Sequence, residues 1–250
     1  MEAVRTRYQG LWNVIRFNWH FYAAAGAAVI LLLAVLPLLT PLGQCFMGLV
    51  VFGILLATGL SLAVTYYVYD GSALYQLRWL DELKTGNQAV VVNVSAGFDE
   101  VSEILEMKFP EAQLQVWDFY DPQQHTEISI KRARAAYPSH ELTQVVETEA
   151  LPMGDSQADL LCLHMAAHEI RDHDQRVIFF AELHRILRDE GRLCVTEHLR
   201  DLPNFMVYNL GALHFYPKTE WLEVFDSAGF EVLKERKETA FVSTFVLKKK

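Results

Sequence analysis

Residues 89–100 read AVVVNVSAGFDE, a nearly continuous β-branched run that ends in a turn with one glycine and two acids. Such a run is typical of a strand that is buried on both faces of a parallel sheet. Residues 159–163 (DLLCL) form a second apolar run of this kind. Segments with helical periodicity alternate with these strands. The alternation indicates an α/β domain with helices on both faces of a mostly parallel sheet.

The same patterns place further elements along the chain. The expected strands cover residues 89–94, 114–117, 142–146, 159–163, 192–196, 230–235 and 240–247, and the expected helices cover residues 99–108, 122–136, 174–187 and 219–228. This order predicts a doubly wound α/β domain with a seven-stranded, mostly parallel sheet. A dehydrogenase is disfavoured, because no Gly-x-Gly-x-x-Gly follows the first strand.

Two long uncharged segments precede this domain. Residues 21–39 and 45–68 each have the length that a bilayer core requires, and residues 40–44 (TPLGQ) link them. They predict a transmembrane helical hairpin. The link has no Lys or Arg, whereas five basic residues flank the hairpin: Arg5, Arg7 and Arg16 before it, and Arg78 and Lys84 after it. The positive-inside rule then places both termini and the α/β domain in the cytoplasm.

Charge is divided unevenly between the two parts. Residues 1–69 contain one acid and three bases, whereas residues 70–250 contain 30 acids and 19 bases, for a net charge of −9. The acidic body excludes a nucleic-acid partner, which needs a basic face. The three cysteines lie in apolar runs and suit reduced thiols. We expect an anchor at 1–69, a linker helix within 70–85 and a ligand-binding domain at 86–250.

Polar residues follow the ends of the predicted strands. In a doubly wound sheet these positions gather at one edge, where ligands bind. The turn at Gly97 lets a ligand approach the backbone, and the helix after it points N–H groups at that ligand. Asp118 is placed to accept both hydroxyls of a ribose, Phe119 to stack on the nucleoside, and Glu147 to reach an adenine amine. This set predicts a site for an adenosyl group.

The segment from Glu147 to His198 carries the most specific motifs. It contains ETEALPM at 147–153, SQADLLCLHMAAHEIRD at 156–172 and FFAELHRILRDEGRLCVTEH at 179–198, and Ala-Gly-Phe follows at 228–230. With these motifs the chain resembles the class I S-adenosylmethionine-dependent methyltransferases from about residue 86 to residue 250. The resemblance implies a Rossmann-like fold that ends in an antiparallel hairpin, and S-adenosylmethionine as the cofactor.

The glycine-rich turn departs from the family pattern. The family has an acid followed by Gly-x-Gly-x-Gly, and the matching positions here are Asn93, Ser95, Gly97 and Asp99. Ser95 and Asp99 add a Cβ where the backbone approaches the cofactor, and Asn93 keeps hydrogen bonding without the charge. Asp99 or Glu100 is placed to face the α-ammonium group of the cofactor instead.

The resemblance also implies roles for residues after the strands. His168 is expected to be the general base for a hydroxyl acceptor, because an imidazole titrates near neutral pH. Thr148 and His164 complete the expected cofactor site. The connection after the fifth strand commonly covers the acceptor in this family. The expected acceptor-binding residues are His198, Tyr208, His214, Phe215 and Tyr216.

Two functions from different classes remain open. The first is a membrane-anchored methyltransferase that O-methylates a lipophilic small molecule, because an aromatic cover and a hairpin in the bilayer both suit such an acceptor. The second is a catalytically inactive relative that acts as a membrane-tethered binding or assembly factor, which the altered glycine turn favours.

No metal ion is expected. Small residues in the spans permit a homo-oligomer.

Overall fold

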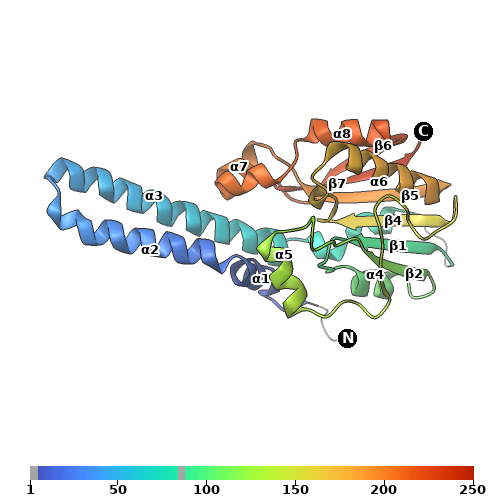
Figure 1. Cartoon of the computed structure of the whole chain (residues 1–250), viewed down its shortest axis with the longest axis horizontal. Coiled ribbons are helices and arrows are strands. Elements are labelled where there is room, and N and C mark those ends of the chain that lie inside the picture. The colour runs from blue at the N-terminus through green and yellow to red at the C-terminus, as the bar shows by residue number, and fades with distance from the viewer. Residues whose placement is uncertain (1–4, 84–87) are drawn as a thin grey trace.

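A computed structural model describes residues 5–83 and 88–250 of the chain. The α/β part contains a seven-stranded sheet with the order β3-β2-β1-β4-β5-β7-β6 (Figure 1). The strands are β1 (Val90–Ser95), β2 (Gln113–Asp118), β3 (Thr143–Val145), β4 (Ala158–His164), β5 (Leu187–His198), β6 (Phe230–Lys237) and β7 (Val242–Lys249). β7 is antiparallel to β5 and β6, and the pairs among the other strands are parallel. The predicted fold class is therefore confirmed.

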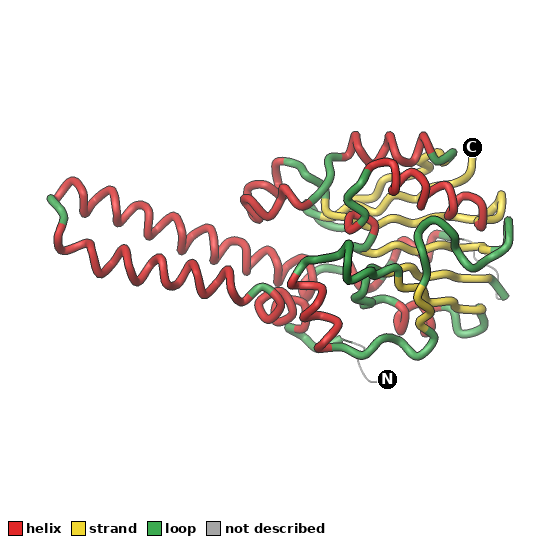
Figure 2. Tube along the Cα trace, in the orientation of Figure 1, coloured by secondary structure: helices red, strands yellow, loops and turns green. Residues whose placement is uncertain are grey.

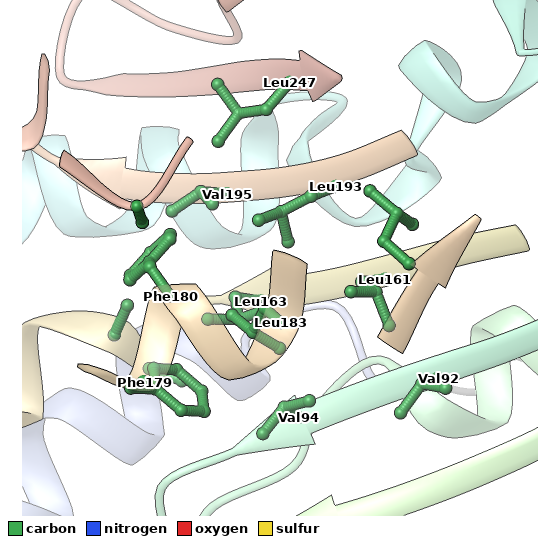
Figure 3. Close-up of a cluster of buried hydrophobic side chains, with 14 of the residues drawn as sticks. Val92, Val94, Leu161, Leu163, Phe179, Phe180, Leu183, Leu193, Val195 and Leu247 are labelled. Atoms are coloured by element: carbon green, nitrogen blue, oxygen red, sulfur yellow. The ribbon is translucent and has the colours of Figure 1, made fainter. Parts of the chain in front are cut away.

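The core lies between the sheet and the helices on its two faces. Helices α6 (His173–Ile186) and α8 (Lys218–Ser227) pack on one face, and α6 inserts Phe179, Phe180 and Leu183 against β1, β4 and β5 (Figure 3). Helix α4 (Ser102–Lys108) covers part of the other face through Ile104 and Leu105. Burial of these side chains contributes about 2 kcal/mol each to folding.

A helical hairpin extends away from the α/β part (Figure 2). Its arms are α2 (Trp19–Val35) and α3 (Pro41–Tyr66), joined by a short turn at Leu36–Leu38. Thr40 caps α3 by accepting a hydrogen bond from the Gly43 N–H, and Pro41 suits the first helical turn. Among the described residues, these two helices are long and apolar enough to cross a membrane, and most of their side chains are exposed.

The base of the hairpin is fixed to the carboxyl edge of the sheet. A short helix, α1 (Gln9–Phe17), precedes α2, and the Asp70 carboxylate accepts hydrogen bonds of 2.8 Å from the Gly10 and Leu11 N–H groups at its start. The Tyr69 hydroxyl lies 2.8 Å from Nε2 of His198, at the end of β5. The carboxyl ends of the strands therefore face the hairpin (Figure 1).

The linker after α3 differs from the single helix expected within 70–85. It forms two short 3-10 turns, Leu74–Gln76 and Arg78–Glu82, separated by Leu77 in a left-handed conformation with φ 46°. The turn lets Leu77, Trp79 and Leu80 all pack against the sheet beside α4, which a straight helix would not allow. The expected boundary between residues 85 and 86 lies outside the described residues.

The helix expected at 122–136 is also shorter. α5 begins at Ile128 and ends at Ala136, because Asp121 and His125 stabilise a turn before it. The Asp121 N–H donates to Nδ1 of His125, and the Asp121 carboxylate accepts from the Gln123 N–H. α5 consequently lies beside α1 at the carboxyl edge (Figure 1).

Candidate functional site

The sheet brings the predicted cofactor residues to one edge. Asn93 and Ser95 lie in β1, Asp118 ends β2, and His164 ends β4. The loops that follow the strands carry the remaining members of the set, namely Gly97, Asp99, Phe119, Glu147 and Thr148. Phe119, Glu147 and Thr148 line one cavity, and His164 lines a second. The remaining members of the set line neither of these two cavities, namely Asn93, Ser95, Gly97, Asp99 and Asp118.

The larger cavity, of about 580 Å³, opens beside the end of β2. Phe119, Tyr120, Glu147 and Thr148 line it, and Ile170 closes it from the loop after β4. Glu147 is exposed to solvent, whereas the Phe119 side chain is buried against His125 and Phe179. An aromatic wall with a carboxylate at the rim suits a flat heteroaromatic ring with an exocyclic amine.

The smaller cavity, of about 250 Å³, lies between the sheet edge and α1. Its sheet side carries Ala96, Phe98, His164 and His168. Its other wall is formed by one face of α1, with Gly10, Asn13, Val14 and Phe17 at helical spacing. This wall was not predicted from the sequence, although the i, i+3, i+4, i+7 pattern of these residues was visible before the first span.

Asp118, the predicted ribose acceptor, lines neither of these two cavities and is held by α5. The Arg134 guanidinium binds Oδ2 of Asp118, and the Tyr120 N–H donates to Oδ1 at 2.9 Å. Gly97 has φ 93°, and a Cβ there would meet Tyr120 at 2.9 Å and Arg134 and Ile130 at 3.1 Å. Both oxygens of the predicted ribose acceptor therefore have protein partners, and the hollow left beside Ser95, Gly97 and Asp118 is only about 20 Å³.

Several buried polar atoms of the predicted cofactor residues have no hydrogen-bond partner among the described residues. They are Oδ1 of Asn93, Oδ2 of Asp99 and both ring nitrogens of His164. Oδ1 of Asp99, by contrast, accepts from the Asn93 side chain and from two N–H groups at the start of α4. Burial lowers the pKa of His164 to about 3, so this ring is neutral at pH 7. Unpaired buried polar atoms are costly and mark a place for a polar ligand.

The donor chemistry at the sheet edge therefore fits the two ends of S-adenosylmethionine. Asp99 and His164 offer partners for its ammonium and carboxylate groups, and the larger cavity suits adenine. At the ribose position Asp118 is present, but Arg134 holds it. A ribose could bind Asp118 only after Arg134 gives up its contact with this carboxylate.

His168 lies in a cluster of buried acids. Its Nδ1 lies 2.7 Å from Oε2 of Glu197, a fully buried carboxylate at the end of β5, and its Nε2 lies 3.2 Å from Glu169. Burial alone would lower the pKa of His168, but Glu197 and Glu169 raise it to about 10. Nε2 of His214 lies 3.5 Å from the same oxygen of Glu169, and its ring lies beside that of His168. The His168 ring is therefore an imidazolium at neutral pH, oriented by Glu197.

Three of these groups could in principle hold a metal ion. Ligand atoms of His168, Glu169 and His214 lie within 4.8 Å of one another. However, the Arg171 guanidinium lies against both ring nitrogens of His214, and it adds a positive charge where a cation would bind. The arrangement favours a hydrogen-bonded charge cluster.

The expected acceptor residues are only partly brought together. His214 lines the smaller cavity. Within the described part of the chain, His198, Tyr208, Phe215 and Tyr216 line neither of the two cavities.

His198 instead joins β5 to the hairpin. Its ring stacks on Phe215, and its Nδ1 donates to the Phe241 carbonyl at 3.0 Å, so its Nε2 accepts from Tyr69. Burial lowers the pKa of His198 to about 4.

Comparisons with known proteins agree with this geometry. Residues 121–195 match a family described as a methyltransferase domain. No curated protein matches the chain.

Solved structures of similar fold include an S-adenosylmethionine-dependent methyltransferase from Methanosarcina mazei, with 15% identity, a TM-score of 0.51, and coverage of 70% of this chain and 97% of that chain. Human N-acetylserotonin methyltransferase, in complex with S-adenosylmethionine, has 15% identity and a TM-score of 0.50, over 78% of this chain and 55% of that chain. An O-methyltransferase family 2 protein from Planctomyces limnophilus, in complex with apigenin, has 17% identity and a TM-score of 0.51, over 78% of this chain and 61% of that chain. The chain therefore has the fold of the class I S-adenosylmethionine-dependent methyltransferases.

Proposed function

We propose that this chain is a membrane-anchored, S-adenosylmethionine-dependent methyltransferase that methylates a hydroxyl group on a lipophilic small molecule. The observation that carries the proposal is the His168 ring, which lines the smaller cavity at the base of the apolar hairpin and is held through Nδ1 by the buried Glu197. A histidine fixed by a buried carboxylate is a suitable proton acceptor for a hydroxyl nucleophile.

The residues of the sheet edge would hold the cofactor in an extended form. Asp118 would accept the ribose hydroxyls, Glu147 and Phe119 would bind the adenine, and Asp99 and His164 would bind the amino-acid end. When bound, S-adenosylmethionine would supply an activated sulfonium methyl group. The chain's own task is then to orient the acceptor and to remove its proton.

His168 reaches the required state in two ways. Above its pKa the imidazole is neutral, and Nε2 can accept the hydroxyl proton while Nδ1 stays bound to Glu197. Alternatively, an acceptor that displaces Glu169 from Nε2 removes one of the two carboxylates that raise the pKa of His168. Glu197 is a positioning residue in both cases, because it holds the ring through Nδ1.

The placement of the cavity supports a lipophilic acceptor. α1 forms one wall of the cavity and directly precedes the first arm of the hairpin, with Asn18 between the two helices. Phe17, Phe98 and Tyr137 pack on one another beside this wall. With the hairpin in a bilayer, the cavity would lie near the headgroup level, where a lipid-dissolved molecule can reach it without crossing water.

Arg134 on Asp118 favours a second candidate, an inactive protein that binds or assembles other components at the membrane. In that case the pair would be a permanent structural link that replaces the ribose. The two candidates differ in one measurable property, the affinity for the cofactor.

The test uses the full chain in lipid nanodiscs with methyl-labelled S-adenosylmethionine and a panel of phenols of increasing hydrophobicity. We expect methyl transfer that rises with acceptor hydrophobicity and falls steeply in His168→Ala. His173→Ala is the matched control, because His173 also pairs with a glutamate, Glu220, but lies at the start of α6. An absence of both cofactor binding and transfer would reject the methyltransferase in favour of the inactive protein.

A further inference from the structure

A second apolar surface lies outside the hairpin. Residues 202–213 (LPNFMVYNLGAL) form an uncharged run within an otherwise acidic body. They fold into α7 (Leu202–Tyr208) and a 3-10 turn, η6 (Asn209–His214). Leu202, Met206 and Leu210 are 72%, 63% and 77% exposed, and Phe205 and Leu213 are exposed as well. So many large apolar side chains in one exposed segment mark an interaction surface.

The segment is held firmly in this orientation. Asp201 caps α7 by accepting from the Asn204 N–H at 3.1 Å, and the buried Asn204 side chain donates to the Phe241 carbonyl at 3.0 Å. Val207 and Ala212 are buried on the inner side. These contacts fix the orientation of α7 and η6, so their exposed apolar side chains point away from the α/β part.

The surroundings of the segment identify what covers it. α7 contacts α3 of the hairpin, and both extend from the same end of the α/β part (Figure 1). Arg200, two residues before the segment, is exposed and suits an anionic lipid headgroup, whereas the intervening Asp201 is engaged as the cap of α7. Tyr8, just before α1, and Trp12, on α1, are exposed aromatic residues, and α1 also contacts α3. Apolar and aromatic side chains thus flank the hairpin at its base.

We propose that α7 and η6 lie in the bilayer interface, with Leu202, Met206 and Leu210 inserted among the acyl chains. This inference rests on the membrane anchor of the proposed function. A helix of this kind inserts about 5–10 Å below the headgroups. Because η6 ends at His214, which lines the smaller cavity, the inserted segment leads from the lipid to the site.

The experiment places one fluorescent label at a time in the full chain. Cys45 is first changed to Ser, and the buried Cys162 and Cys194 are kept. Single variants Met206→Cys, Met107→Cys and Leu31→Cys are labelled and reconstituted in vesicles that contain lipids with a quencher at a shallow or a deep acyl position. Met107, on α4, is the matched control, because it is an exposed methionine near the amino ends of the strands. Leu31, in the middle of α2, reports on the anchor.

The expected result is loss of fluorescence at residue 206, stronger with the shallow quencher than with the deep one, loss at residue 31, and no loss at residue 107. Loss at residue 31 without loss at residue 206 overturns the inference and leaves the anchor intact. Protection of the label at residue 206 from an aqueous quencher, without quenching by lipid, also overturns it and indicates a second copy of the chain. No loss at any position removes the anchor and the inference together. Equal loss at residues 107 and 206 overturns the inference, because the quenching is then unspecific.

Discussion

The Arg134 guanidinium binds the Asp118 carboxylate at the carboxyl end of β2. Asp118 is almost fully buried, whereas about a third of the Arg134 side chain is exposed. Arg134 also stacks over the Tyr120 ring and lies within 3.4 Å of the Gly97 carbonyl. The Arg134 side chain therefore contacts three parts of the predicted nucleoside site, namely the Asp118 carboxylate, the Tyr120 ring and the glycine turn. If the site binds a nucleoside, Arg134 competes with that nucleoside.

The first prediction follows from this competition. In Arg134→Ala the affinity for S-adenosylhomocysteine should rise about tenfold, equivalent to about 1.4 kcal/mol, because the ribose hydroxyls no longer displace a guanidinium. Calorimetric titration of the detergent-solubilised chain measures the change. Arg188→Ala removes a comparable Arg–Asp pair, with Asp159, away from the site and should leave the affinity unchanged. An affinity for S-adenosylhomocysteine that stays the same or falls in Arg134→Ala would show that Arg134 does not compete with the cofactor for Asp118.

The second prediction concerns His168. His168→Ala should lower kcat by about 10²–10⁴-fold, the usual contribution of a general base. Binding of S-adenosylhomocysteine should change little, because His168 touches the acceptor side of the cavity. Steady-state kinetics with the best phenolic acceptor and a parallel calorimetric titration separate the two effects. Unchanged turnover in His168→Ala would remove its assignment as the base.

Glu197 gives a third prediction through its effect on His168. In Glu197→Gln the imidazole loses a buried carboxylate that raises its pKa, so the pKa of His168 should fall. The neutral, proton-accepting ring then forms at lower pH, and the rise of kcat/KM with pH should move to lower pH. If Glu197 were purely structural, Glu197→Gln would lower the stability of the protein without shifting the pH profile of kcat/KM. An unshifted profile would therefore reject Glu197 as a positioning residue.

The stability of the protein should also depend on this histidine. The pKa of His168 is about 10 in the folded chain and near 6.5 when unfolded. Because the folded value is raised, the stabilisation is fully present below pH 6.5 and is lost as the pH rises through about 10. Thermal unfolding of the wild type and His168→Gln between these values should show a difference in Tm that shrinks with rising pH. A difference that grows with pH would mean that the ring is held neutral in the folded state.

The strands were the part of the fold that could be predicted from the sequence. Residues 89–94 and 159–163 are apolar on both sides, and only a central position in a parallel sheet buries such a segment completely. The left-handed turn at Leu77 could not be predicted, because it depends on packing of Trp79 and Leu80 against α4. The late start of α5 depends in the same way on a local pair, Asp121 with His125.

Some features of the candidate site could likewise be predicted from the sequence, and others could not. Asp118 and His168 follow strands, so the topology alone places them at the carboxyl edge. The contacts of Arg134 and the wall formed by α1 depend on how distant segments meet, and one sequence does not reveal this. His198 illustrates the opposite case, because it follows a strand as the site residues do, yet Tyr69 and Phe215 enclose it at the base of the hairpin.

The proposed enzyme requires that the sheet edge between Asn93 and Asp118 bind S-adenosylmethionine. Calorimetric titration of the solubilised full chain with S-adenosylhomocysteine measures this binding without the need for an acceptor. We expect saturable binding of one ligand per chain, which disappears in Asp118→Ala and persists in Asp155→Ala, a variant that loses an exposed partner of Arg185. No binding to the wild type and to Arg134→Ala alike would contradict it.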